Sequence, residues 1–360
     1  MKKIIFASIC LVLVLYLLGC QEKGTDNSSK APVIAYEKLN VDIDLLEAES
    51  PTCCYTDESQ MIFSVGVRNG AQDGPLVNTT RLVIYDYSSG KITKEYLIDS
   101  EAYIYNAMPY GDGILFSTYG NLDEKKTLWK VQHISEKGIK TIDRGYARSY
   151  DLIPNFGINK EGIIYCYEDI DEGEYTFGVK AVNGLNSDIV FSEESDYRLV
   201  NPGRFPCNNN NYMLMVGKLK DDYATMVIGD QSGITGKYPL KEKLSSYGIN
   251  DNMAICSSVK TQDEYSLHTV NLKTREEDHT NSGRPLFRIE GSGDSFVSVD
   301  SKFNLFVINN SEEVTKVEFD PPGEIGKGYF SFVLFYPISN GNYIALFDNE
   351  HYYKMKVSYR

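Results

Sequence analysis

One short pattern occurs seven times along this chain, and it constrains the fold more than any other feature. Each copy is a polar or glycine-rich turn followed by a β-rich run. The copies span 58–67, 111–120, 160–169, 209–218, 250–259, 291–300 and 339–348. Their equivalent apolar positions are Met61, Ile114, Ile163, Tyr212, Met253, Phe296 and Tyr343, spaced 41 to 53 residues apart. A period of this length indicates a repeat of one supersecondary unit rather than an irregular fold.

A second element follows most copies of the pattern, namely two alternating strands joined by a tight polar turn. These predicted hairpins span 80–98, 126–143, 175–191, 224–240, 265–280 and 303–319. Their turns contain the Gly, Asn and Ser residues that short strand connections require. A less polar stretch precedes each copy and supplies one more strand. Each repeat is therefore predicted to be a four-stranded antiparallel unit.

The two ends of the chain complete the last repeat. The final copy stops after 351–360, one strand short, and the alternating stretch 34–48 is predicted to supply the missing outer strand. The resulting fold is all-β, a single seven-bladed β-propeller over residues 34–360, because ring closure removes exposed sheet edges. The alternatives are an irregular two-sheet sandwich, a pair of β domains, and a ring of six or eight blades.

The N-terminus has the layout of an export signal. Two lysines precede an apolar run from Ile4 to Leu18, which is too short to span a bilayer comfortably. Leu17, Leu18, Gly19 and Cys20 then resemble the lipobox of bacterial lipoproteins. The resemblance implies that residues 1–19 are a signal peptide cleaved before Cys20, and that the Cys20 thiol carries a diacylglyceryl group. An ordinary secretory signal and an uncleaved anchor helix are the alternatives.

Residues 20–33 are predicted to be the lipidated cysteine and a flexible tether, because 21–30 contain no large apolar side chain. The protein is therefore expected on the extracytoplasmic face of a cell membrane, with the bilayer as one partner. Its net charge is −14, and loss of Lys2 and Lys3 with the signal makes the body −16. Such an acidic surface argues against nucleic-acid binding.

Five cysteines remain in the body, which is an odd number and therefore does not indicate a disulfide framework. They are Cys53, Cys54, Cys166, Cys207 and Cys256. Small buried residues within strands are the expected role. Cys53 and Cys54 are adjacent, and a vicinal disulfide between them is the alternative.

No catalytic, cofactor or metal motif is apparent. The sequence contains no G-x-S-x-G elbow. His133, His268, His279 and His351 are expected in outer hairpins of different repeats, away from any shared site. The acidic run 168–174 departs from a calcium loop at its sixth and twelfth positions, where Gly and Glu are required, and is expected to be a solvated loop.

The body has a general resemblance to exported TolB-like and quinoprotein-like propellers, at the level of architecture over residues 34–360. It lacks the repeated aspartate box of sialidases, and with Trp129 as its single tryptophan it lacks the docking motif of quinoproteins. The predicted function is a binding or scaffold propeller, without enzyme activity or cofactor, for an envelope protein, a peptide or a glycan. A propeller glycosidase or polysaccharide lyase with acids from separate blades is the alternative.

The loops that enter the innermost strands are rich in Tyr and Arg, residue types that dominate protein and sugar recognition. These side chains are predicted to form a binding face at the channel mouth, and their alternative role is packing between blades and pairing with acids. The candidates are Tyr103, Tyr105, Arg144, Tyr146, Arg148, Tyr150, Tyr197, Arg198, Arg204, Tyr247, Arg284 and Tyr329.

The lipobox generates a direct prediction. Cys20→Ser removes the thiol that receives the lipid, so the body is expected to leave the membrane fraction or to retain its signal peptide. Membrane fractionation with mass measurement of the mature chain checks this. Unchanged localisation and processing in the variant would show that Cys20 is not the anchor.

Overall fold

The computed structural model describes residues 31–68, 77–98, 103–123, 126–148, 153–171, 173–194, 197–200, 205–218, 223–318, 333–347 and 351–359. The signal peptide, Cys20 and most of the tether lie outside these residues. Strands, turns and irregular segments make up the whole described part, which contains no helix. Accordingly, none of its segments is a helix able to cross a bilayer.

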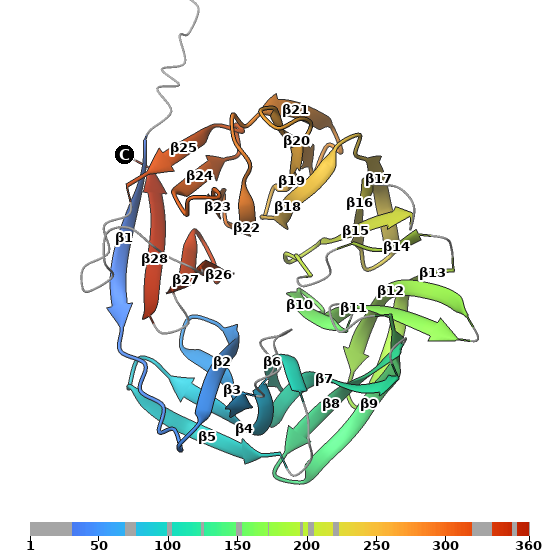
Figure 1. Ribbon diagram of the computed structural model, residues 1–360, viewed down its shortest axis with the longest axis vertical. Helices are drawn as coiled ribbons and strands as arrows, with labels where there is room; N and C mark the ends of the chain where they lie inside the picture. The colour runs from blue at the N-terminus through green and yellow to red at the C-terminus, as the bar shows by residue number, and fades with distance from the viewer. Residues whose placement is uncertain are drawn as a thin grey trace, which may run out of the picture.

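The described strands form seven four-stranded antiparallel blades arranged in a ring (Figure 1). Blade 1 consists of β2 (Glu49–Thr56), β3 (Gln60–Arg68), β4 (Val77–Asp86) and β5 (Lys91–Leu97). Blade 2 consists of β6 (Tyr103–Tyr110), β7 (Gly113–Asp123), β8 (Lys126–Ser135) and β9 (Gly138–Ala147). Blade 3 consists of β10 (Asn155–Asn159), β11 (Gly162–Asp171), β12 (Glu174–Asn183) and β13 (Asn186–Glu194).

The remaining blades repeat this order, with the first strand nearest the centre. Blade 4 consists of β14 (Tyr197–Leu199), β15 (Tyr212–Lys218), β16 (Ala224–Asp230) and β17 (Gly233–Pro239). Blade 5 consists of β18 (Lys243–Ile249), β19 (Met253–Val259), β20 (Tyr265–Asn271) and β21 (Glu277–Asn281). Blade 6 consists of β22 (Phe287–Ser292), β23 (Ser295–Val299), β24 (Leu305–Asn309) and β25 (Val314–Val317).

Blade 7 closes the ring with strands from both ends of the chain. It consists of β26 (Val333–Pro337), β27 (Asn342–Phe347), β28 (His351–Tyr359) and β1 (Pro32–Leu39). β1 pairs with β28 over eight residues, from Pro32 opposite Tyr359 to Leu39 opposite Tyr352. The predicted closure is confirmed, although the strand begins at Pro32 and ends at Leu39 rather than extending to residue 48.

The repeat defined from sequence corresponds to the second strand of every blade. All seven equivalent positions, from Met61 in β3 to Tyr343 in β27, lie at the start of a second strand and are buried. Blades 1 and 2 are further joined by one ladder contact, between Asn78 in β4 and Tyr103 in β6. The seven-bladed β-propeller prediction is therefore confirmed.

Asx turns connect the first and second strands of several blades. The Asp57 carboxylate accepts the backbone N–H groups of Ser59 and Gln60 at 2.8 and 2.9 Å. Asn208 and Asn250 accept the amides two and three residues ahead of them in the same way. An Asx side chain that bonds its own backbone fixes a tight turn, so these residues set where each second strand begins.

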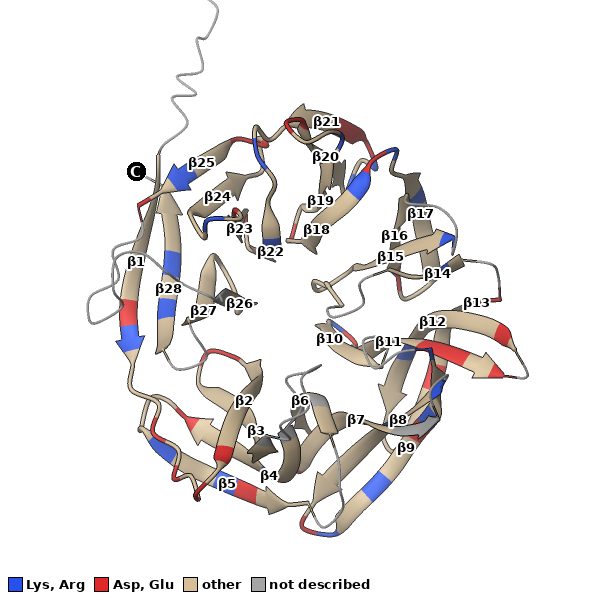
Figure 2. Cartoon of the chain, viewed as in Figure 1, with Lys and Arg blue, Asp and Glu red and all other residues tan. Residues whose placement is uncertain are grey.

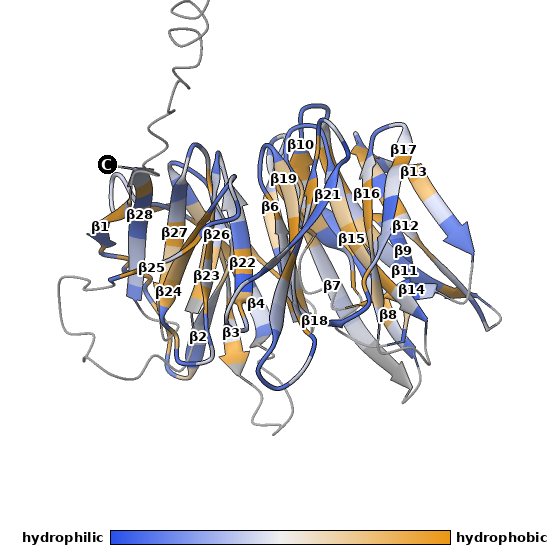
Figure 3. Cartoon of the chain, turned by 90° about the horizontal axis from the view of Figure 1, so that it is seen from above, coloured by the Kyte–Doolittle hydropathy of each residue, from blue (hydrophilic) through white to orange (hydrophobic). Residues whose placement is uncertain are grey.

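Apolar side chains fill the spaces between neighbouring blades. The cluster between blades 6 and 7, for example, includes Val307 and Tyr343, and β1 adds Ile34 and Tyr36 to it. Figure 3 shows hydrophobic residues along the strands and hydrophilic residues at the turns. Charged residues are frequent on outer strands such as β1, β5 and β9 (Figure 2). A single blade cannot bury both of its apolar faces, so each blade depends on its neighbours.

Trp129 is the largest fully buried side chain and joins blades 2 and 3. Its indole Nε1 donates a 2.8 Å hydrogen bond to the backbone O of Glu168 in β11. Gly145 in β9 makes room for the ring, because a Cβ there would lie 2.4 Å from Cζ2 of Trp129. The tryptophan therefore serves as an inter-blade packing residue.

Trp129→Ala is expected to lower the free energy of unfolding by about 3–5 kcal/mol, because it opens a cavity and leaves a buried carbonyl without its donor. Urea unfolding of the body measures this loss. Ile189→Ala is the control, since the Ile189 side chain in β13 is 66% exposed and its removal should change the free energy of unfolding by about 0.5 kcal/mol or less. Equal effects of the two changes would contradict the packing role.

Candidate binding site in the central channel

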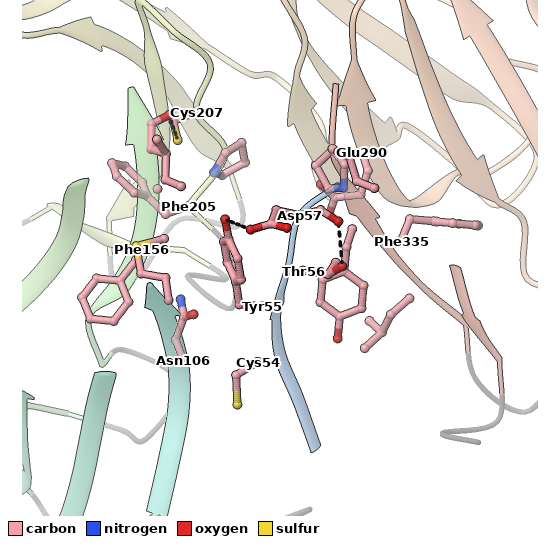
Figure 4. A pocket seen from close by; sticks show the side chains of 18 of the residues that line it. Cys54, Tyr55, Thr56, Asp57, Asn106, Phe156, Phe205, Cys207, Glu290 and Phe335 are labelled. Carbon is pink, nitrogen blue, oxygen red and sulfur yellow. Dashed lines mark hydrogen bonds between the residues drawn. The ribbon is translucent and has the colours of Figure 1, made fainter. Parts of the chain in front are cut away.

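A cavity of about 990 Å³ lies at the centre of the ring. Its lining comes from the first strand of most blades and from the turns that follow these strands, with residues from all seven blades. Figure 4 shows part of the wall, with side chains from blades 1, 2, 3, 4, 6 and 7. The closed ring therefore brings residues that are far apart in sequence to one site.

Blade 1 contributes a continuous run of residues to this wall. A bulge between Cys53 and Tyr55 shifts the register of β2 against β3. The Tyr55 hydroxyl donates to the Asp57 carboxylate at 3.3 Å (Figure 4). Burial alone would raise the pKa of Asp57, but hydrogen bonds from Ser59 and Gln60 outweigh it and lower the pKa. Asp57 is therefore ionised at neutral pH and held by its own turn.

The adjacent cysteines of blade 1 are free thiols rather than a vicinal disulfide. The Sγ of Cys53 donates to the backbone O of Tyr55, and the Sγ of Cys54 donates to that of Thr52, both at 3.5 Å. Burial raises the pKa of Cys54 to about 12 and that of Cys53 further. The thiolate is the reactive form of cysteine, so both thiols are protonated and unreactive at neutral pH.

Blades 2 to 4 supply amide, aromatic and aliphatic groups. The Asn106 side chain donates to the Asn155 side chain at 2.5 Å, which links blades 2 and 3 beside the cavity. Phe156 and Phe205 add aromatic surface (Figure 4). Ile158 lines the cavity and is 46% exposed. This part of the wall thus presents apolar surface to whatever occupies the channel.

Blades 5 and 6 carry three of the four charged groups in the described wall. Arg288 lies in a bulge of β22 with φ +52°, in the left-handed region, and burial lowers its pKa. Burial and the nearby Asp294 raise the pKa of Asp251. Glu290 and Asp57 also line the cavity, so its described wall holds three carboxylates and one guanidinium. The net charge of the wall favours a neutral or basic ligand.

Three carboxylates line the described part of the cavity wall. Asp57, Asp251 and Glu290 come from blades 1, 5 and 6. A glycosidase of the usual kind requires two carboxyl groups that flank one bond. Asp57 is already engaged by the backbone of its turn.

The structure brings only part of the predicted Tyr and Arg set to the channel. Tyr103 lines the cavity. Arg144 and Tyr146 lie instead in β9, the outermost strand of blade 2, and Tyr247 is buried in the core between blades 4 and 5. The side chain of Tyr105 and all of Tyr150, Arg204 and Tyr329 lie outside the described residues.

The remaining candidates make contacts away from the cavity. The Arg284 guanidinium lies 4.6 Å from the centroid of the Phe306 ring and 4.0 Å from the Asp300 carboxylate. The Nζ of Lys218 lies 5.3 Å from the centroid of the Tyr197 ring. Arg148 and Arg198 meet over a third residue, Tyr175. Their predicted role in binding stays a prediction.

The channel residues that sequence reasoning missed include Tyr55, Asn106, Phe156, Phe205 and Phe335. Four of them, all but Phe205, belong to the first strand of a blade, and this position is the signal that could have found them. Bulges in β2 and β22 obscure the alternation that would otherwise show which side chains face the channel.

The histidines differ from the expectation in one respect. His268 in β20 lies directly opposite His279 in β21, with ring centroids 4.4 Å apart, so these two belong to one blade rather than to different repeats. The Nε2 of His268 also lies 3.2 Å from the Glu242 carboxylate and 2.9 Å from the Ser258 hydroxyl. The described chain nevertheless contains no group of three His, Cys, Asp or Glu residues suited to a metal ion.

The expectation that the acidic run 168–174 is a solvated loop is wrong for most of its residues, because 168–171 belong to β11, Glu174 begins β12, and Glu168 is buried. Glu168 pairs with Arg148 through two contacts of 2.8 and 3.0 Å. The Asp169 carboxylate accepts the backbone N–H groups of Tyr146 and Ile170. Within the described part of this run, these two side chains are therefore structural.

Comparisons with known proteins support the fold and go no further. No protein-family model and no curated protein matches the chain. Among solved structures, it is similar to BamB from Moraxella catarrhalis, with a TM-score of 0.50 and 10% identity over 91% of this chain and 99% of that one. The Neurospora crassa Pan2 WD40 domain also gives a TM-score of 0.50 and 10% identity, over 86% of this chain and 89% of that one. At this identity the likeness shows that the body is a β-propeller.

Proposed function

We propose that this protein is a lipid-anchored propeller on the extracytoplasmic face of a membrane, and that it binds an extended segment of a partner protein in its central channel. The cavity lined by all seven blades carries the proposal. Concave sites with apolar walls and a few polar groups are typical of ligand binding. The lining combines aromatic rings, amides and a small number of charges, which matches this description.

The exposed Ile158 side chain favours a peptide over a glycan. When a ligand covers an aliphatic group that is in contact with water inside a cavity, each Å² covered contributes about 25 cal/mol to the free energy of binding. An apolar side chain of a peptide supplies that cover, whereas a sugar presents mainly hydroxyl groups. The excess of carboxylates in the wall further favours a neutral or basic segment.

The proposed anchor is compatible with an open channel. β1 is the outermost strand of blade 7 and begins at Pro32, so the described chain enters the ring at its rim rather than at its centre. A lipid on Cys20 would thus hold the body near the bilayer while the cavity stays accessible.

Ile158→Arg tests the channel. The variant places a positive charge where the ligand is expected to bury apolar surface, so capture of envelope proteins by the lipidated protein in its own membrane should fall at least about tenfold. Quantitative mass spectrometry of the captured proteins measures the loss.

The matched control is Ile189→Arg, which makes the same change at an exposed isoleucine on the outer strand β13. Capture should be unchanged in this control. Equal capture by wild type and Ile158→Arg, with both variants folded, would show that the channel is not the binding site.

A further inference from the structure

Two arginines meet over one tyrosine where blades 2, 3 and 4 adjoin. Arg148 directly follows β9, Arg198 lies in β14, and Tyr175 lies in β12. The guanidinium carbon of Arg198 lies 3.4 Å from the centroid of the Tyr175 ring, and that of Arg148 lies 6.0 Å from it. None of these residues lines the central cavity. The group is therefore a site separate from the channel.

Among the residues that the structure describes, the charges of this group do not balance. Arg148 is neutralised by Glu168, whose side chain is 1% exposed and contacts the guanidinium through both carboxylate oxygens. Arg198 is only 8% exposed. In the described part of the chain, no ion pair includes the Arg198 guanidinium, and its Nε has no hydrogen-bond acceptor.

A buried guanidinium without a counter-ion is costly, because desolvation removes the water that would otherwise stabilise its charge. Stacking on the Tyr175 ring compensates for part of this cost, since the face of an aromatic ring attracts a cation. Stacking leaves the in-plane Nε–H of the Arg198 guanidinium without an acceptor among the described residues. An anion placed in that plane would complete the arrangement as Glu168 does for Arg148.

We propose that Arg198 is the centre of an anion-binding site whose ligand is a carboxylate. The planar fork of a guanidinium matches the two oxygens of a carboxylate. Phosphate has compatible geometry, but it carries more charge. The protein has a net charge of −14, and Asp171 and Glu174 shortly precede Tyr175 in sequence, so a monoanion meets less repulsion than a dianion.

The first experiment follows the Nε–H resonance of Arg198 by NMR in the full-length protein labelled with ¹⁵N-arginine. Sodium acetate is titrated against sodium chloride and sodium phosphate at equal ionic strength. Acetate is expected to shift this resonance in a saturable way, while chloride does not. Absence of a saturable shift, or a stronger response to phosphate than to acetate, overturns the proposal.

The second experiment compares Arg198→Lys and Arg198→Met by thermal unfolding in the same salts. Acetate is expected to raise the melting temperature of the wild type and to leave that of Arg198→Met unchanged. Arg198→Lys keeps the positive charge but loses the planar pair of donors of the guanidinium. Acetate binding should therefore weaken by about tenfold, which corresponds to the loss of one charge-assisted hydrogen bond. An acetate response that persists in Arg198→Met contradicts the site.

Arg284→Met is the matched control, because Arg284 also stacks on a ring but has the Asp300 carboxylate beside it. This variant should respond to acetate as the wild type does. Without acetate, Arg198→Met should melt no lower than the wild type, since it removes an uncompensated charge. If Arg198→Met does not fold, the arginine supports the structure, and the wild-type NMR titration alone decides the proposal.

Discussion

The pairing of β1 with β28 is the interaction on which the rest of this structure depends. Every blade hides its apolar faces against its two neighbours, so an open array would leave two faces and a sheet edge exposed to water. The eight-residue ladder from Pro32 to Leu39 completes blade 7 and adds Ile34 and Tyr36 to the core between blades 6 and 7. Closure of the ring thus pairs the open edge of β28 and also buries apolar side chains between blades 6 and 7.

The same closure creates the central cavity, because its wall takes residues from all seven blades. No local motif marks such a site, since each blade contributes a few side chains at intervals of roughly one repeat. This distribution explains why the sequence carries no recognisable catalytic or ligand-binding signature. The channel and the Arg198 group therefore depend on different parts of the structure. The first requires the whole ring, and the second requires only the junction of blades 2 to 4.

The fold could be predicted because its signals are local and repeated. A polar turn followed by an apolar run identified the second strand of every blade. The side chains of Asp57, Asn208 and Asn250 accept backbone N–H groups of the turn and so fix where the second strand begins. The site could not be predicted to the same extent. A bulge at Cys53 to Tyr55 changes which side chains face the channel, and a sequence does not reveal a bulge. The contact of Arg148 and Arg198 with Tyr175 depends on how three blades pack, which strand periodicity does not specify.

Disulfide trapping of the closing strands tests the account most directly. Ala35 and Lys356 are exposed and lie opposite each other in the β1–β28 ladder. The pair Ala35→Cys with Lys356→Cys should form a disulfide under mild oxidation, identified by mass spectrometry of the linked peptides, because directly opposed strand residues are close enough to be bridged. Ala35→Cys with Lys354→Cys, which is out of register, should link far less. Equal linkage in both pairs, or none in the first, would contradict a ring closed by the two ends of the chain.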